Sequence, residues 1–355
     1  SAAVGGVGGA ALAGRAAPPI PACSAPVDAQ TLPADLAQTG CMAMNEPTRF
    51  ADVVLPYEVN SPLWSDGADK LRGLRLPDQG KIQIKDCSVH PDECSQPADS
   101  GKWLLPIGSV LLKSFAFDGK LVETRLFAHL ADDSWVGYTY RWNEAQTRAE
   151  LVPDDRVQVS FDTGKRKLDW SFPSRVDCMK CHNPAGGSSL GLETAQLNRS
   201  FQGQSQLDAL TARGLFQEPP AKPYAAAYVT PYKDQAGEPP AGTSLETRAR
   251  SYLHANCAYC HRPDGDFPYL DLRYATPFAS SALCGTAPMK GDVGVASATN
   301  LTPGMPMQST TWLRMAAKPG QGRMPQIGTS RVDDAGLALI GDWIRSISLM
   351  VLRAV

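Results

Sequence analysis

Two CxxCH motifs constrain this chain more than any other feature of its sequence. Residues 178–182 read CMKCH and residues 257–261 read CAYCH. The chain has only five histidines, and two of them, His182 and His261, directly follow the two CxxC pairs. A CxxC pair alone fits a redox dithiol or half of a zinc site, whereas CxxCH is typical of covalent haem c attachment. The sequence therefore predicts two covalently bound haems c.

The spacing within each motif suits this chemistry. Two residues between the cysteines let both sulfurs reach the same porphyrin, and the next histidine reaches the iron, so His182 and His261 are the predicted proximal ligands. A zinc site made of two CxxC halves is the alternative, but these halves lie too far apart and would not require the histidines. A thioredoxin-like dithiol is disfavoured because no βαβ pattern surrounds either motif. The predicted attachment residues are Cys178, Cys181, Cys257 and Cys260.

Composition limits the remaining classes. A chain of 355 residues with 29 prolines and 31 glycines is long enough for two or three domains with many loops. Its net charge of −2 argues against a nucleic-acid partner. The most hydrophobic segment, residues 337–352, is interrupted by Asp342 and Arg345, so no transmembrane segment is predicted.

The other cysteines indicate the compartment. Haem attachment takes place on the oxidising side of the membrane, where spare thiols tend to pair. Cys87 and Cys94 flank a short polar loop and are the first predicted disulfide; Cys41 with Cys284 is the second. Cys23 is left without a predicted disulfide partner. A lipid anchor on it is disfavoured because no strong apolar segment precedes it. The N-terminal SAAVGGVGGAALAG lacks the features of a signal peptide, so a mature periplasmic or extracellular protein is expected.

The first half of the chain has the periodicity of β-strands. Short alternating apolar runs occupy residues 82–84, 110–117, 121–130, 135–142 and 157–161. Asp118-Gly119 is a hairpin signal, because glycine supplies the positive φ that the favoured turn needs. Asp132-Asp133-Ser134 reads as the next turn. This region is therefore predicted to be an antiparallel β meander forming a sandwich or a partly closed barrel.

The second half has helical signals. Residues 193–214 are predicted to form a helix that ends at Gly214, and Ser244 is the expected N-cap of a helix that leads into the second motif. Residues 334–347 form an expected amphipathic helix entered by two aspartates. The predicted fold is α+β, with a mostly α-helical haem-binding region after the β-rich domain. The predicted domains are a tail at 1–44, a β-rich domain at 45–172, a first haem-binding segment and linker at 173–243, and a class I cytochrome c domain at 244–355.

The C-terminal region resembles a class I cytochrome c domain. The resemblance is carried by CAYCH at 257–261, by Met324-Pro325 and by the helix DAGLALIGDWIRSI at 334–347. It implies that His261 is the proximal iron ligand and Met324 the distal one, with Met315 as the competing methionine.

A wider resemblance covers most of residues 45–350. YEVNSPLWSDGADKLRGLRLP, ETRLFAHL, WVGYTYRWNEAQTRAEL, CMKCHNPAGGSSLGLETAQLN and RARSYLHANCAYCHRP together resemble a family of bacterial dihaem c-type cytochromes with a β-rich N-terminal region. The resemblance implies electron transfer outside the cytoplasm, and some relatives accompany sugar or alcohol dehydrogenases. The loop KDCSVHPDEC looks like an insertion, which leaves His90 without a family role.

The distal ligand of the first haem stays open at this point. His129, near the end of a strand, is the first candidate, and His254, three residues before Cys257, is the second. His90 is expected in solvent. Met289, Met305 and Met307 follow as further candidates. Because His/Met ligation raises the potential relative to bis-His ligation, two differently ligated haems would form a downhill pair.

Three functional classes follow from these residues. The first is a non-enzymatic electron carrier between a dehydrogenase or another cytochrome and a terminal acceptor. The second is a haem enzyme of the dihaem peroxidase type, for which Glu193 is a candidate acid/base group, although a helix-start carboxylate is its simpler reading. The third is a homo-oligomer, in which subunits build an extracellular conducting filament. Arg262 and Arg323 are candidates for pairing with haem propionates, with solvent exposure as the alternative for each.

Overall fold

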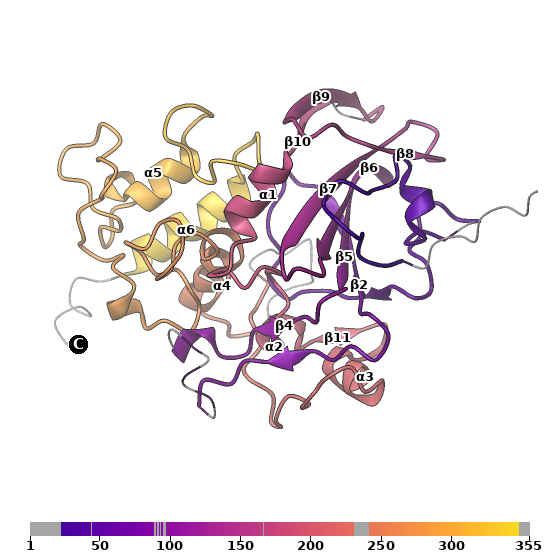
Figure 1. The fold of residues 1–355 in the computed structure, drawn as a ribbon. Coiled ribbons are helices and arrows are strands. Elements are labelled where there is room, and N and C mark those ends of the chain that lie inside the picture. Colours follow the sequence, from indigo (N-terminus) through magenta and orange to yellow (C-terminus); the bar gives the residue numbers. More distant parts are fainter. Residues whose placement is uncertain are drawn as a thin grey trace, which may run out of the picture.

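The computed structural model describes residues 23–347 of the chain, except residues 44, 89, 91, 93, 95, 96, 166 and 231–240. The glycine-rich start of the predicted tail and the middle of the predicted linker lie outside these residues. A β-sheet forms one side of the molecule and the C-terminal helices form the other, with helix α1 between them (Figure 1). The first CxxCH motif therefore lies where the two sides meet.

The main sheet has six strands, in the order β1-β2-β5-β6-β7-β8. All neighbouring strands in it are antiparallel. The strands are β1 Leu55–Pro56, β2 Asp69–Arg75, β5 Val110–Phe117, β6 Lys120–His129, β7 Trp135–Trp142 and β8 Ala149–Leu151. The predicted β-rich region and its antiparallel meander are confirmed.

The predicted turns connect these strands. Asp118 and Gly119 join β5 to β6 with φ values of 52° and 82°, the paired positive angles that a tight hairpin needs. Asp133, with a φ of 67°, lies in the turn from β6 to β7.

The expected closure of the sheet is wrong. Within the described residues, β1 and β8 stand at the two ends of the strand order, so hydrogen bonds do not close the sheet into a barrel. Among the described residues, strands β9 Val157–Asp162 and β10 Lys167–Phe172 pair only with each other and form a separate hairpin. The periodicity of residues 157–161 identified a strand, but the partner of a strand is set by tertiary packing.

The main sheet is buried on both faces. Leu112, Leu126 and Tyr138 are cross-strand neighbours on one face, which packs against the segment that follows Cys23. On the opposite face Leu111 and Phe127 join a cluster that includes side chains from beyond the first motif. This second face carries the first motif.

The segment after the first motif is less helical than expected. Residues 193–214 were predicted as one helix, but they form two short helices, α2 Thr194–Leu197 and α3 Gln206–Ala212. A small hairpin of β11 Ser200–Phe201 and β12 Gln204–Ser205 separates them. Gln202 and Gly203 have φ values of 51° and 81° in the hairpin turn, which a continuous helix does not allow. Gly214 follows the end of α3 as predicted.

Three helices pack together in the C-terminal region. They are α4 Leu245–Cys257, α5 Thr310–Ala316 and α6 Asp334–Ser346. Ser244 and Asp333 are the N-caps of α4 and α6, and each side chain accepts a hydrogen bond from a backbone N–H of the first turn, so both predicted helix starts are confirmed. A cluster that includes Leu253, Ile340 and Trp343 forms their common core.

The expectation of a mostly α-helical haem-binding region is wrong. The C-terminal region contains helices of only 13, 7 and 13 residues, and long loops connect them. Residues 262–333 contain eight prolines and eight glycines, which interrupt helices. The described part of the chain is mainly β-sheet and loops. Its shorter elements are β3 Gln83–Ile84, β4 Trp103–Leu104, α1 Arg175–Cys181 and the 3-10 helices Leu36–Thr39, Pro97–Asp99, Phe278–Ser280 and Pro306–Gln308.

Two disulfides are present. Cys87 pairs with Cys94 as predicted, whereas Cys41 pairs with Cys23 and not with Cys284. The Cα atoms of Cys23 and Cys41 lie 4.5 Å apart, within the range that a disulfide requires. Cys284 is a free thiol. Because disulfides persist in oxidising compartments, this chain is a non-cytoplasmic protein. Among the helices of the described residues, none combines the length and apolar character needed to cross a membrane.

Candidate functional site

The first motif lies on helix α1, which packs against strand β7 (Figure 1). Ser174 caps this helix, and Asp177 completes a capping box by bonding back to the Ser174 backbone. Gly137 on β7 lets the helix approach closely, because a Cβ atom there would lie 2.8 Å from the Cys178 sulfur. The cap and the glycine together fix the position of the first cysteine on the sheet.

His182 ends α1 with its ring turned toward the sheet. The ring centroid lies 4.2 Å from that of Phe127. Its Nδ1–H donates to the carbonyl oxygen of Ser188 at 2.6 Å, which leaves the proton-free nitrogen at Nε2. Burial lowers the pKa of His182 to about 3, so the imidazole is neutral over the physiological range. A neutral imidazole with Nδ1 held by a carbonyl is the usual form of a histidine that binds a metal through Nε2.

The second motif lies at the end of α4. Cys257 is the last residue of the helix, and His261 follows in a loop with its ring centroid 5.2 Å from that of Phe267. Burial, with the nearby charge of Arg314, lowers the pKa of His261 to about 4. Its Nδ1 atom is buried and has no hydrogen-bond partner among the described residues. This second imidazole is also neutral, but its ring is not oriented by a carbonyl.

The two motifs lie next to each other, although they are distant in the sequence. The sulfur of Cys260 is 3.4 Å from the carbonyl oxygen of Lys180, which is 80 residues away in the chain. Asn183 donates a side-chain hydrogen bond to the carbonyl oxygen of Tyr259 at 3.4 Å. An interaction between the thiols raises the pKa of Cys181 and lowers that of Cys260. The structure therefore brings the predicted attachment residues of both motifs into one site.

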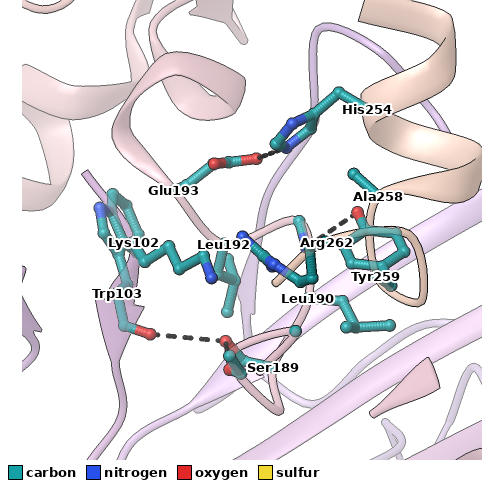
Figure 2. Close-up of a pocket in the computed structure, with 13 residues that line it drawn as sticks. Lys102, Trp103, Ser189, Leu190, Leu192, Glu193, His254, Ala258, Tyr259 and Arg262 are labelled. Carbon is teal, nitrogen blue, oxygen red and sulfur yellow. Dashed lines mark hydrogen bonds and ion pairs between the residues drawn. The ribbon is translucent and has the colours of Figure 1, made fainter. Parts of the chain in front are cut away.

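A small pocket lies between the loop that follows the first motif and the start of the second motif. The loop after the first motif and the end of α4 line it, and Figure 2 shows Glu193 facing His254 across it. Away from this pair, Ser189 donates to the carbonyl oxygen of Trp103 at 3.5 Å (Figure 2). The Tyr259 hydroxyl accepts from the Gly191 N–H at 3.3 Å, a further link between the second motif and the loop after the first.

His254, the second candidate for the distal ligand of the first haem, has hydrogen bonds at both ring nitrogens. Nδ1 accepts from the Tyr274 N–H at 3.0 Å, so Nε2 carries the proton and donates to Glu193 at 2.8 Å. Glu193 also accepts from the Tyr228 hydroxyl at 3.2 Å. Burial opposes ionisation of Glu193, but His254, Lys102 and Tyr228 hold its pKa below the usual value. Glu193 occupies the N-cap position of α2, so its prediction as a helix-start carboxylate is confirmed, although its side chain bonds to His254 and Tyr228 and does not cap the helix.

His129, the first candidate for the same role, is also held by hydrogen bonds. Its Nδ1 lies 3.1 Å from the Leu105 carbonyl oxygen and its Nε2 lies 2.8 Å from an Asp133 carboxylate oxygen. Its ring stacks on Trp135 at 4.4 Å. Trp135 in turn stacks on Phe127, the residue that contacts the ring of His182. A row of aromatic rings therefore lies between His129 and His182.

The predicted methionine ligands lie in another part of the site. Met324 and its competitor Met315 line one small cavity together with Arg323. His261 is not among the residues that line it. Met289, Met305 and Met307 are 62%, 51% and 65% exposed, and His90 is exposed as expected.

Buried charges adjoin both motifs, and sequence reasoning missed most of them. Arg262 is 2% exposed, so the solvent-exposed reading of this side chain is wrong, and Arg323 is buried as well. Lys102, Arg262 and Arg273 all reach one oxygen of Asp99, at 3.0, 3.1 and 3.0 Å. Burial and the Arg262 charge lower the pKa of Lys102 to about 8. No local sequence pattern signals this network, because its members come from two segments that lie far apart in the chain.

The description of this chain as an iron-binding dihaem cytochrome is not supported by the structure. Among the described residues, no group of three or more His, Cys, Asp or Glu side chains could hold a metal ion, and the structure contains no haem-binding group of that kind. The rings of the two motif histidines contact Phe127 and Phe267. No protein-family model, curated protein or solved structure matches the chain.

Proposed function

We propose that this protein is an electron carrier that binds two haems c covalently, one at each CxxCH motif. The observation that supports this most directly is the contact between the motifs, given by the 3.4 Å approach of Cys260 to Lys180. Two redox groups attached at neighbouring motifs would exchange electrons within one subunit. A protein that needed two independent sites would have no reason to bring these motifs together.

The residues of each motif fit a haem c. The cysteines at both motifs are free thiols, as thioether formation requires. His182 offers Nε2 because its Nδ1 is bonded to Ser188, and His261 has a buried Nδ1 that lacks a partner. A haem iron takes at most two ligands from the protein, so this fit does not depend on a cluster of three side chains. The haems, when bound, supply reversible one-electron chemistry; the chain holds and orients them and excludes water.

The proposed location is the periplasm or the cell exterior. The two disulfides fit either compartment, and haem c attachment takes place on the same side of the membrane. The proposed partners are a dehydrogenase or another cytochrome as donor and a terminal acceptor beyond it. Assembly of subunits into a filament stays a prediction.

The proposed ligand pairs differ between the two haems. Met324 remains the proposed distal ligand of the second haem, with Met315 in the same cavity as the alternative. In the first site, His129 and His254 would each have to give up a hydrogen bond before binding iron. Met324→Ala is expected to keep the covalent haem and to lower its reduction potential, measured by spectroelectrochemistry, with Met315→Ala as the matched control.

The test of the proposal is the mass of the protein after expression with a haem c maturation system. The wild type should carry two covalent haems, and Cys178→Ala/Cys181→Ala should carry one. Cys23→Ala/Cys41→Ala, which removes a disulfide outside the motifs, is the matched control and should keep both haems. A wild-type protein without covalent haem would refute the proposed function.

A second candidate, a dihaem peroxidase, is favoured by one observation. Glu193 and His254 form a buried acid/base pair in the cavity between the motifs. An electron-paramagnetic-resonance spectrum of the oxidised protein separates the candidates. Two low-spin signals favour the carrier, whereas a stoichiometric high-spin signal together with peroxide turnover would favour the enzyme.

A further inference from the structure

Three basic side chains lie directly opposite one another on the sheet face that carries the first motif. Arg72 on β2 pairs in register with Lys113 on β5, and Lys113 pairs with Arg125 on β6. We call these three residues the cation row. Lys70, two residues from Arg72 on the same strand, adds a fourth positive charge on this face. Like charges opposite one another destabilise a sheet, so this row needs an explanation.

Two carboxylates contact the cation row, one fewer than its three basic side chains. Glu58 accepts from Arg72 at 3.0 Å, and Glu123 accepts from Arg125 at 2.6 and 3.0 Å. Glu123 is fully buried and also accepts from the indole N–H of Trp170. Within the described residues, no carboxylate is within salt-bridge distance of Lys113, whose ammonium lies over the ring of Phe115. Burial and the neighbouring cations lower the pKa of Lys113 well below its ordinary value.

The network at Asp99 gives a useful contrast. There, Lys102, Arg262 and Arg273 share Asp99, and Asp271 forms a second salt bridge with Arg273. In that group each of the three cations contacts a carboxylate. The cation row also has three basic side chains and two carboxylates, but within the described residues neither carboxylate lies within salt-bridge distance of its central member, Lys113.

The cation row adjoins the first motif. Phe127, which contacts the ring of His182, lies two residues beyond Arg125 on the same face of β6, about 7 Å along the strand. Gly137, which makes room for Cys178, pairs in register with Phe127. One face of the sheet thus places the cations beside the cysteine and the histidine.

We propose that the cation row binds the two carboxylates of the haem attached at Cys178 and Cys181. This inference rests on the proposed function. A haem carries its two carboxylates on one edge, and a haem bound through His182 against this face extends over neighbouring residue rows. Arginine binds a carboxylate through paired hydrogen bonds and lysine through a point charge, so the row suits two adjacent carboxylates. The negative charges would supply the compensation that Lys113 lacks.

The test compares Lys113→Gln with Lys113→Arg in the haem-loaded protein. Lys113→Gln removes one cation, so the reduction potential of the first haem should fall and should vary more strongly with pH. Lys113→Arg keeps the charge and should restore the wild-type values. Lys120→Gln removes an exposed cation at the start of the neighbouring strand β6 and is the matched control. The one-haem variant Cys178→Ala/Cys181→Ala shows which redox wave belongs to the first haem.

The outcomes separate this inference from the proposed function. A wild type without covalent haem would refute the proposed function and leave the cation row without this ligand. Two covalent haems with the same first potential in Lys113→Gln and wild type would overturn the inference alone. A first-haem potential that changes when citrate or phosphate is added to the wild type would also overturn it, because the row would then be open to soluble anions.

Discussion

The two CxxCH motifs have the same chemistry but lie on different supports. The first is on α1, a helix of seven residues that packs on a β-sheet, and the second ends α4, a helix of 13 residues in a helical core. His182 is oriented by the carbonyl of Ser188, whereas Nδ1 of His261 has no partner among the described residues. The motif thus determines which sulfur and nitrogen atoms are present, and the secondary structure around it determines their orientation and electrostatic surroundings.

The largest expected effect comes from the two histidines. His182→Ala and His261→Ala should each remove one low-spin signal from the electron-paramagnetic-resonance spectrum and leave the other unchanged. The physical reason is that each imidazole is the proposed proximal ligand of one iron. Loss of both signals in either variant would show that the two sites are not separate, and His90→Ala, at an exposed histidine, is the control.

The second prediction concerns two glycines that allow close packing, Gly137 beneath α1 and Gly336 beside Tyr252 of α4. In Gly137→Ala the new methyl group would lie 2.8 Å from the Cys178 sulfur, and in Gly336→Ala it would lie 2.5 Å from the Tyr252 ring. Each substitution is expected to lower the free energy of unfolding by about 1–3 kcal/mol, because overpacking forces backbone shifts. Denaturant unfolding measures this change. Only Gly137→Ala should alter the optical spectrum of the first haem, and an altered second haem would contradict the assignment.

The third prediction concerns the hydrogen bond between Glu193 and His254, which joins the loop of the first motif to the helix of the second. Glu193→Gln should lower the free energy of unfolding at neutral pH by about 1–3 kcal/mol, since it weakens a buried charged hydrogen bond. Thermal unfolding over a pH series measures this effect.

The pH dependence of the same variant has a defined sign. The pKa of Glu193 is lower in the folded protein, so its ionisation stabilises the fold above the unfolded pKa of about 4.3. This contribution is lost as the pH falls through the folded pKa. Glu193→Gln should therefore flatten the acid side of the stability curve. An equally flat curve for Glu144→Gln, at an exposed site, would contradict this reason.

The smallest expected effect compares the two helix caps. Ser174 accepts from the Asp177 N–H at 3.2 Å, and Ser244 accepts from the Thr247 N–H at 3.1 Å. Ser174→Ala and Ser244→Ala should each cost about 1 kcal/mol in the free energy of unfolding. Hydrogen exchange should show faster opening of α1 in Ser174→Ala, because a shorter helix depends more on its cap. Equal acceleration of hydrogen exchange in α1 of Ser174→Ala and in α4 of Ser244→Ala would contradict the idea that the shorter helix depends more on its cap.

Local features of the fold were predictable because they depend on neighbouring residues. The positive φ angles at Asp118-Gly119, the N-caps Ser244 and Asp333, and the disulfide between Cys87 and Cys94 all follow from residues close in the chain. The helix predicted over residues 193–214 failed because a hairpin turn at Gly203 interrupts it. Helical composition could not reveal this turn, since tertiary pairing of β11 with β12 decides it.

The sequence by itself determined the two motifs, their cysteine spacing and the histidine that follows each pair. Only the tertiary structure decided that the motifs touch, that Cys23 pairs with Cys41, and that the cation row lies beside the first motif. The physical reason is one of distance along the chain. A CxxCH motif is complete within five residues, whereas these contacts join segments whose relative positions depend on strand register and on the packing of the sheet against the helices.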